Sequence, residues 1–363
     1  MITLTVDIQA STQSGACLLT LCKICQEPFT PQAHNQVYCG PVCKRKREAD
    51  ATRLGITYER RCRNCDRFFT TAIPKKQFCQ PTCQREHVIR RQHSRAHEVP
   101  SLEPEALSYI KIDKAASGTR LVILSDTQIP FHDTRVLGGV SRFLVDWKPN
   151  TLILNGDIAD CYELSNYDKS PSRVAHLQDE VTEVRYWLKR WREDVGPEGT
   201  IHYILGNHEA RLSRFLTRRA PELAGLEDLT LYRLYGLGEL NMQLIAYEGW
   251  IEYLGFRISH GARVSNSAPA AGMTARQMII RRGGSGVIGH THRRAQVSFR
   301  DDKGIHTWYE GGCLCNLRPF YGKEPFDWAH AFLYGEVHNN KLHLHLVNIY
   351  EDGFWAGGNY YAI

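Results

Sequence analysis

From residue 119 onward the chain alternates short apolar runs with longer amphipathic segments. The runs are rich in aliphatic and β-branched side chains and end at polar clusters, which indicates buried strands. Between them, apolar residues recur at helical spacing and predict amphipathic helices. The predicted strands are 121–125, 151–155, 201–205, 256–259 and 286–289, and the predicted helices are 134–147, 177–193 and 209–219. This alternation predicts a layered α/β domain.

The regions on either side of this alternation have other patterns. The tail from 295 to 350 reads mostly as strands, for which we expect a second sheet. Pro, Ser, Glu and Gly mix without periodicity before residue 119 and predict a linker. We therefore divide the chain into an N-terminal segment 1–20, small modules at 21–52 and 58–96, a linker 97–118 and a large domain 119–363.

Eight of the twelve cysteines form two sets with the spacing C-x2-C-x13-C-x3-C, the second set repeating the first at an offset of 40 residues. Tetrahedral zinc takes four thiolates, and modules this small need a metal to fold. Disulfides or unrelated buried cysteines are the alternatives, against which the duplicated spacing argues. We predict two structural Zn²⁺ sites in modules that resemble treble-clef-like zinc fingers. Their ligands are Cys22, Cys25, Cys39 and Cys43, and Cys62, Cys65, Cys79 and Cys83.

The basic residues are concentrated in the N-terminal quarter. Residues 1–98 hold 16 Lys and Arg against 8 Asp and Glu, while the whole chain has a net charge of +6. Basic residues follow the last cysteine of each set, so nucleic acid is the partner that we expect. Protein docking or oligomerisation is the alternative, because each zinc ion bound by four thiolates carries a formal charge of −2. These basic residues are 44–47, Arg85, Arg90, Arg91 and Arg95.

The sequence shows no sign of a membrane partner. No stretch approaches the roughly 18 consecutive apolar residues that a membrane-spanning helix needs. The first basic residue is Lys23, so the N-terminus is a poor signal peptide. We expect a cytoplasmic location with reduced thiols.

Polar residues cluster where the predicted strands end. Ligand sites of open α/β sheets gather outside the carboxyl ends of the strands. Loops bearing Asp, Asn and His at five strand ends therefore predict a shared metal site. The loops are Asp126-Thr127-Gln128, Gly156-Asp157-Ile158-Ala159-Asp160, Gly206-Asn207-His208-Glu209, His260-Gly261 and Gly289-His290-Thr291-His292.

In this order, the motifs D-x-Q, GDxxD, GNHE, HG and GHTH resemble those of the calcineurin-like metallophosphoesterase superfamily. The resemblance spans 119–363 and implies a four-layer αββα sandwich that hydrolyses phosphate esters with two metals. It implies that Asp157 bridges the metals. One metal would have the ligands Asp126, Asp157 and His292, with Gln128 at a further position, and the other Asp157, Asn207, His260 and His290.

For His208 the resemblance also implies a role beside the metals, and for Arg211 and Asp160 we infer roles from their positions next to the motifs. His208 would donate to a phosphate oxygen and protonate the leaving group. Arg211 would clamp the substrate phosphate, or else be an ordinary helix-face arginine. Asp160 would orient the loop or a ligand. We interpret His132 and Asp133 as loop residues, and Cys313 and Cys315 as buried structural residues.

One position departs from the family pattern. The usual first motif is D-x-H, whereas this chain has Gln128 at the third place. An amide oxygen favours harder ions, so we expect Mn²⁺ as the activator, with Mg²⁺, Fe or Zn²⁺ as alternatives. Weak binding at this position could lower or abolish activity.

The sequence leaves the identity of the ester open. We expect a nucleic-acid phosphodiesterase, or nuclease, to which the zinc modules deliver the polymer. One alternative is a phosphomonoesterase or small-nucleotide phosphodiesterase whose modules dock a protein partner. Another is a non-catalytic, metal-bound binding module. Protein Ser/Thr phosphatases carry GDxVDRG where this chain has GDIADCY, which argues against that branch.

Overall fold

The chain forms two compact units, Met1–Val99 and Pro100–Ile363. Among the described helices, none is both long and apolar enough to cross a lipid bilayer. The basic residues that follow each cysteine set lie outside the described residues. The computed structural model describes residues 19–31, 36–43, 58–65, 67–71, 73, 76–84, 102–166, 176–261, 264, 270–318 and 327–363.

In the smaller unit the two cysteine sets have the same backbone structure. A hydrogen bond from Lys23 N to Val37 O, 3.0 Å long, recurs as one of 2.9 Å from Arg63 N to Gln77 O. Short helical turns at the fourth cysteine of each set, at 41–43 and 81–84, also recur. The duplication in the sequence is therefore a duplication in structure. The antiparallel pairs are β1 (Thr20–Leu21) with β2 (Pro28–Phe29), and β3 (Tyr58–Arg61) with β4 (Phe68–Thr71).

The larger unit is built on one mixed sheet of eleven strands, in the order β12-β13-β11-β10-β9-β8-β7-β6-β14-β15, with β5 paired to β9. Strands β6 to β9 are parallel, as strand–helix units require. The strands are β5 (Leu107–Ile112), β6 (Arg120–Leu124), β7 (Thr151–Asn155), β8 (Thr200–Ile204), β9 (Met242–Tyr253), β10 (Phe256–Ser259), β11 (Ser285–Ile288), β12 (Arg294–Asp301), β13 (Gly304–Gly311), β14 (Ala331–His338) and β15 (Lys341–Asn348).

This sheet folds over so that one of its faces packs against itself. Side chains such as Ile123, Ile204, Val287 and Leu333 form a buried cluster to which the described helices contribute no residue. A hydrogen bond from Tyr309 Oη to the carbonyl of Leu344, 3.5 Å long, joins β13 to β15. The expectation of a separate second sheet is therefore wrong, because the two layers are halves of one continuous sheet.

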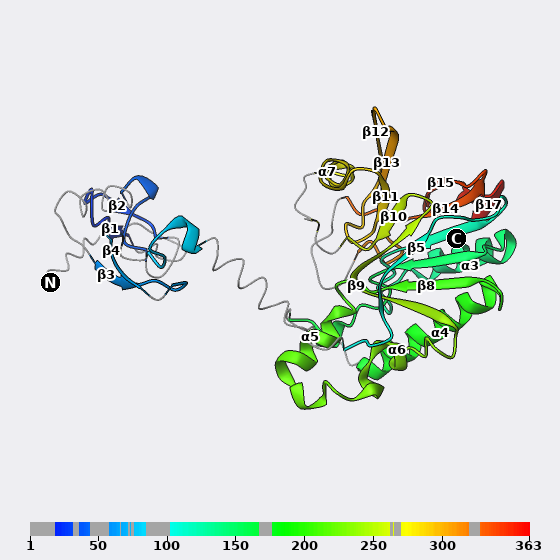
Figure 1. Cartoon of the computed structure of the whole chain (residues 1–363), viewed down its shortest axis with the longest axis horizontal. Helices are drawn as coiled ribbons and strands as arrows, with labels where there is room; N and C mark the ends of the chain where they lie inside the picture. The colour runs from blue at the N-terminus through cyan, green and yellow to red at the C-terminus, as the bar shows by residue number, and fades with distance from the viewer. Residues whose placement is uncertain are drawn as a thin grey trace, which may run out of the picture. The chain divides into compact units, whose positions relative to one another are not determined.

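Helices cover the outer faces of both halves. In the larger core cluster, α3 (Thr134–Trp147) and α4 (Leu177–Val195) pack on β6, β7 and β8. On the other outer face, Ala275 and Met278 of α7 (Met273–Arg282) pack on Ile288 and Trp308. Figure 1 shows α7 beside the β12–β13 hairpin, away from α3 and α4. The layer order is helix, sheet, sheet, helix, as the resemblance implied.

The predicted helices are present, with ends shifted by two residues at most. A hairpin beyond the main sheet packs on α3 through Phe354 and Tyr361. The helices are α3 (Thr134–Trp147), α4 (Leu177–Val195), α5 (Ala210–Arg219), α6 (Leu231–Leu234) and α7 (Met273–Arg282), and the hairpin is β16 (Gly353–Ala356) with β17 (Asn359–Ala362).

Much of the predicted linker 97–118 belongs to the folded unit, which corrects the sequence interpretation. Strand β5 lies within it and pairs with β9, but most of its side chains are exposed, so no apolar pattern reveals it. The buried carboxylate of Glu103 accepts hydrogen bonds from Leu231 N (2.6 Å) and Tyr232 N (3.1 Å) at the start of α6. Burial raises the pKa of Glu103 to about 7.

Candidate metal centre

The five polar loops follow β6, β7, β8, β10 and β11 and converge at the carboxyl ends of these strands. Donor atoms of Asp157, His260 and His290 lie within 4.8 Å of one another, as do those of Asp126, Asp157 and His292. Asp157 is common to both groups. The structure therefore brings these predicted ligands together, with Asp157 between the two groups.

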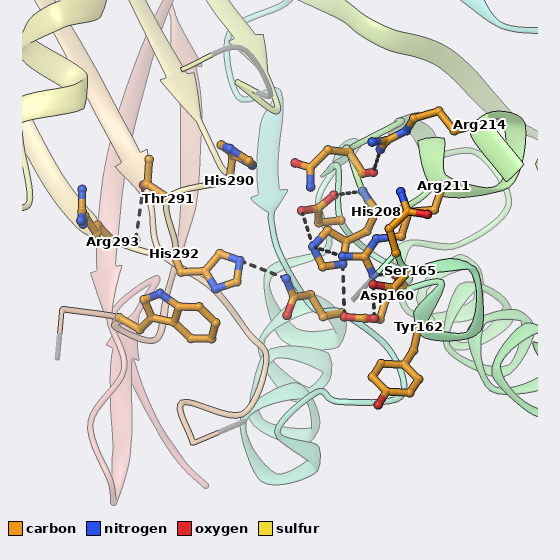
Figure 2. Close-up of a pocket in the computed structure, with 15 residues that line it drawn as sticks. Asp160, Tyr162, Ser165, His208, Arg211, Arg214, His290, Thr291, His292 and Arg293 are labelled. Carbon is orange, nitrogen blue, oxygen red and sulfur yellow. Dashed lines mark hydrogen bonds and ion pairs between the residues drawn. The ribbon is translucent and has the colours of Figure 1, made fainter. Parts of the chain in front are cut away.

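Gln128 and Asn207, the remaining two predicted ligands, lie against His292 and His260. The Nε2 atom of His292 lies 3.2 Å from Asp126 Oδ1 and 3.1 Å from Gln128 Nε2. The Nε2 atom of His260 lies 3.2 Å from Asp157 Oδ2 and 3.1 Å from Asn207 Oδ1. In Figure 2, His290 and His292 face His208 and Asp160 across the site.

The backbone around these side chains is unusual at the same positions. Left-handed conformations are uncommon outside glycine and cluster where surrounding structure enforces them, often at functional sites. One enforcing contact is a 2.9 Å hydrogen bond from Gln128 N to Asp157 O. Among the predicted metal ligands, those with positive φ are Asp126 (55°), Gln128 (48°), Asp157 (50°), His290 (65°) and His292 (56°).

Two glycines leave the space that the ligand side chains occupy. A Cβ atom at Gly156 would lie 2.5 Å from the His260 ring, and one at Gly289 would lie 2.6 Å from Asp126 Oδ2. Only glycine permits this close approach. The glycines of the GDxxD and GHTH motifs are thus explained by packing.

Glu209, for which no role was predicted, organises the loop that presents Asp157. Its buried carboxylate accepts hydrogen bonds from the backbone N–H groups of Asp157, Ile158 and Ala159, at 3.1, 2.7 and 3.0 Å. It also accepts from Gly206 N at 2.9 Å and from Tyr203 Oη at 2.9 Å. This carboxylate therefore ties the β7 loop to the β8 loop. Its place in GNHE was the available signal.

The electrostatics of the centre favour an ionised Asp157. Burial opposes ionisation, but His208 and His260 hold the pKa of Asp157 well below its usual range. Burial also opposes charge on His260, yet Asp157 raises the pKa of His260 to about 10. Burial and the neighbouring His260 lower the pKa of His290 to about 4. A cation bound here would displace the proton of His260, after which a carboxylate, an amide and neutral imidazoles are suitable donors, so these residues fit a pair of metals.

Asp160 connects His208 and Arg211 at the edge of the centre. Its Oδ2 atom lies 3.1 Å from His208 Nδ1, and its Oδ1 atom accepts from Arg211 Nη1 at 3.0 Å. Arg211 Nη2 lies 3.1 Å from His208 Nε2, and that nitrogen lies 3.7 Å from Asp157 Oδ2. Asp157 and Asp160 raise the pKa of His208 despite its burial. His208 and Arg211 thus form one hydrogen-bonded group that faces the centre.

A cavity of about 900 Å³ opens in front of these residues. Its wall includes Tyr162 and Trp328, and the ring centroid of Trp328 lies 4.0 Å from that of His292. Neither aromatic residue was predicted, because a single aromatic position gives no functional signal in one sequence, whether it lies far from a motif, as Trp328 does, or two residues beyond one, as Tyr162 does. The remaining wall includes Gln128, Asp157, Asp160, Asn207, His208, Arg211, Arg214, His290, His292 and Arg293.

Other residues considered from the sequence have structural contacts. Asp133 caps α3 by accepting from Arg135 N and Val136 N, and His132 accepts from Trp187 Nε1 at 3.1 Å. Cys315 is buried as expected.

Cys315 and Glu310 lie behind the GHTH loop. The Sγ atom of Cys315 lies 3.8 Å from His292 Nδ1, the ring nitrogen that faces away from Asp126. Glu310 was not predicted. It accepts from Thr291 Oγ1 at 3.1 Å and supports the GHTH loop.

The two cysteine sets each form a group that could hold a metal ion. The Sγ–Sγ distance is 3.6 Å between Cys25 and Cys39, and again 3.6 Å between Cys65 and Cys79. Such separations are too long for disulfides. They are close to the ~3.8 Å edge of a zinc tetrahedron with Zn–S bonds of about 2.3 Å. The cysteines are free thiols in this arrangement.

Sequence comparison identifies the relatives of the chain. It is 30% identical over 258 residues to the gene 54 protein of Mycobacterium phage L5, a match covering 67% of this chain and 99% of that protein. The chain belongs to the mycobacteriophage gene 54 protein family. The gene 54 protein of Mycobacterium phage D29 is 32% identical over 203 residues, covering 53% of this chain and 74% of that relative. No protein-family model matches this family member.

Solved structures with a similar fold share little sequence with this gene 54 family member. Vacuolar protein sorting 29 from Cryptosporidium parvum is 13% identical, with a TM-score of 0.37 over 68% of this chain and 97% of that one. A dimetal phosphatase from Danio rerio is 10% identical, with a TM-score of 0.30 over 62% of this chain and 94% of that one.

We predict that Glu209→Gln destabilises the larger unit by about 1–3 kcal/mol, because an amide cannot accept from all the backbone donors that the carboxylate satisfies. Urea denaturation measures the change. Glu222→Gln on the exposed surface is the matched control and should change stability by less than about 0.5 kcal/mol. Equal stability of both variants would contradict the role assigned to Glu209.

Proposed function

We propose that the larger unit hydrolyses phosphate esters at the centre around Asp157, with two divalent cations, in the manner of the calcineurin-like metallophosphoesterases. One observation is the main support. Asp157 is common to two donor groups, it lines the cavity together with His290 and His292, and a carboxylate can be shared by two cations. The order of the motifs in the sequence supports the same reaction. Mn²⁺ is the proposed activator, because Gln128 adds an oxygen donor.

The residues of the chain would divide the chemistry among themselves. Bound divalent cations supply electrophilic stabilisation of the phosphoryl oxygens and lower the pKa of water. Water would release a proton to solvent as its oxygen bonds to phosphorus, the ester bond to the leaving oxygen would break, and His208 would give its proton to that oxygen. Asp160 holds His208 through Nδ1 and places Arg211 where its guanidinium reaches a phosphate oxygen.

We propose a polynucleotide phosphodiester as the substrate. Three arginines, Arg211, Arg214 and Arg293, line the cavity beside the proposed metal ligands. Arg211 pairs with Asp160 and Arg293 with Asp327, whereas Arg214 forms no ion pair among the described residues, so its guanidinium suits a polyanion best. The two cysteine modules, each holding Zn²⁺, would help to bring the polymer to this site.

We predict that the protein cleaves a phosphodiester with Mn²⁺ and that Asp157→Asn lowers kcat/KM by more than about 100-fold. Loss of a residue that only supports a metal ligand already costs 10–100-fold. Hydrolysis of bis(p-nitrophenyl) phosphate, before and after chelation, provides the measurement. Asp302→Asn in an exposed turn should retain full activity. Equal rates for Asp157→Asn and the wild type would contradict the proposal.

His208→Ala should affect poor leaving groups most. We predict a loss of about 10²–10⁴-fold with an oligonucleotide, because its alkoxide leaving group requires a proton. The loss with bis(p-nitrophenyl) phosphate should be about 10-fold or less, because nitrophenolate departs without protonation. Initial rates on both substrates test this, and equal losses would exclude His208 as the proton donor.

Zinc content tests the cysteine modules. We predict two zinc ions per wild-type chain and one in a Cys22→Ser/Cys25→Ser variant, because each set supplies four thiolates to one ion. Elemental analysis of protein purified without added metal gives the count. Cys17→Ser, outside both sets, is the control. A variant that retains two zinc ions would contradict the assignment.

A further inference from the structure

A second, smaller cavity adjoins the candidate metal centre along α5. It measures about 180 Å³. Arg211 and Arg214 line both cavities, so the smaller cavity adjoins the larger one at these two arginines. His208 lines the larger cavity beside Arg211. Figure 2 shows both arginines on the α5 side, across the site from His290 and His292. The wall of the smaller cavity comprises Leu164, Asn166, Arg211, Arg214, Phe215, Arg218 and Arg219. We call it the α5 cleft.

The α5 cleft is strongly basic. Helix α5 contains four arginines and no acidic residue. Arg211 is bound by Asp160, but Arg214, Arg218 and Arg219 form no ion pair with any carboxylate in the described part of the chain. All three are exposed. An exposed group of guanidinium ions without carboxylate partners favours binding of an extended anion.

The spacing along α5 fits a chain of anions better than a single one. Arg211, Arg214 and Arg218 follow the i, i+3, i+7 spacing of one helix face. At 1.5 Å per residue, this face spans roughly 10 Å from Arg211 to Arg218, more than one phosphate occupies. Phe215 lies in the same cleft and is 40% exposed. An exposed aromatic ring among arginines is a platform on which an unpaired base can stack.

We propose that the α5 cleft binds the polynucleotide strand flanking the phosphate at the metal centre, an inference that rests on the proposed phosphodiesterase function. Arg214, Arg218 and Arg219 contact successive phosphates, and Phe215 stacks on a base. A single strand fits this arrangement, because the bases of a duplex are stacked on each other and not available to Phe215. The backbone chemistry is shared by DNA and RNA. The larger unit thus recognises polymer itself, in addition to the zinc modules.

The test uses the full-length Arg218→Gln/Arg219→Gln variant, since glutamine preserves helix propensity and removes two charges. Binding of labelled single-stranded DNA and RNA is measured by fluorescence anisotropy across a salt series. We expect Kd to rise about 10-fold and the slope of log K against log salt to fall by about 1.4, because two phosphate contacts are lost. The value of kcat/KM for bis(p-nitrophenyl) phosphate should stay within about 2-fold of wild type, since this ester does not reach the cleft.

Arg281→Gln/Arg282→Gln is the matched control, since it removes the same charge from the last turn of another ten-residue helix, α7. Unchanged Kd and salt slope in the α5 variant, or an equal loss in the α7 variant, would overturn the inference. Similar losses with DNA and RNA support recognition of the shared backbone, and a loss with one polymer alone identifies that polymer as the ligand. If the wild type binds strands through α5 but hydrolyses neither these strands nor bis(p-nitrophenyl) phosphate, the phosphodiesterase proposal fails and the strand-binding site stands.

Discussion

The centre depends on a carboxylate that is almost completely excluded from water. Asp157 is 1% exposed, and an ionised group in such a place requires compensating charge and hydrogen bonds. Its own surroundings supply a backbone N–H from His208 at 2.8 Å and the ring of His260 at 3.2 Å. Asp126, Asp160 and Glu209 are also buried, in the loops that follow β6, β7 and β8. The proposed pair of cations would balance this concentration of negative charge.

The protein holds this arrangement with contacts that do not involve a metal. Glu209 fixes the loop after β7 through its backbone N–H groups, and glycines clear the space for the ligand side chains. The left-handed backbone of the ligand residues costs on the order of 1–3 kcal/mol each, which the surrounding hydrogen bonds and packed strands must offset. A preorganised site is the consequence, in which ligands need little rearrangement to bind cations.

Much of the fold could be predicted because the strands beneath the centre are buried on both faces. Strands such as β6 and β7 read as uninterrupted apolar runs, and their terminal loops hold the predicted ligands. Exposed or irregular elements gave no such signal. Strand β9 is interrupted by exposed polar residues such as Glu248, and α7 buries only Thr274, Ala275 and Met278. That the sheet is continuous depends on long-range pairing, which local pattern does not encode.

The supporting residues could not be predicted for a different reason. Glu103, Glu209 and Glu310 are buried carboxylates that accept backbone or hydroxyl hydrogen bonds, but glutamate is so often exposed that its type alone predicts the surface. For Glu103 and Glu310 the roles follow only from the three-dimensional contacts, whereas the place of Glu209 in the GNHE motif gave a signal in the sequence. The charged face of α5 could not be predicted as a binding site either, because only the cavity beside its arginines indicates that they bind a ligand.

Anomalous diffraction from crystals grown with Mn²⁺ tests the central claim most directly. The account predicts two manganese peaks about 3.5–4 Å apart, one on each side of the carboxylate of residue Asp157. A map with no manganese peak at this carboxylate, or with one ion that does not contact it, would contradict the account.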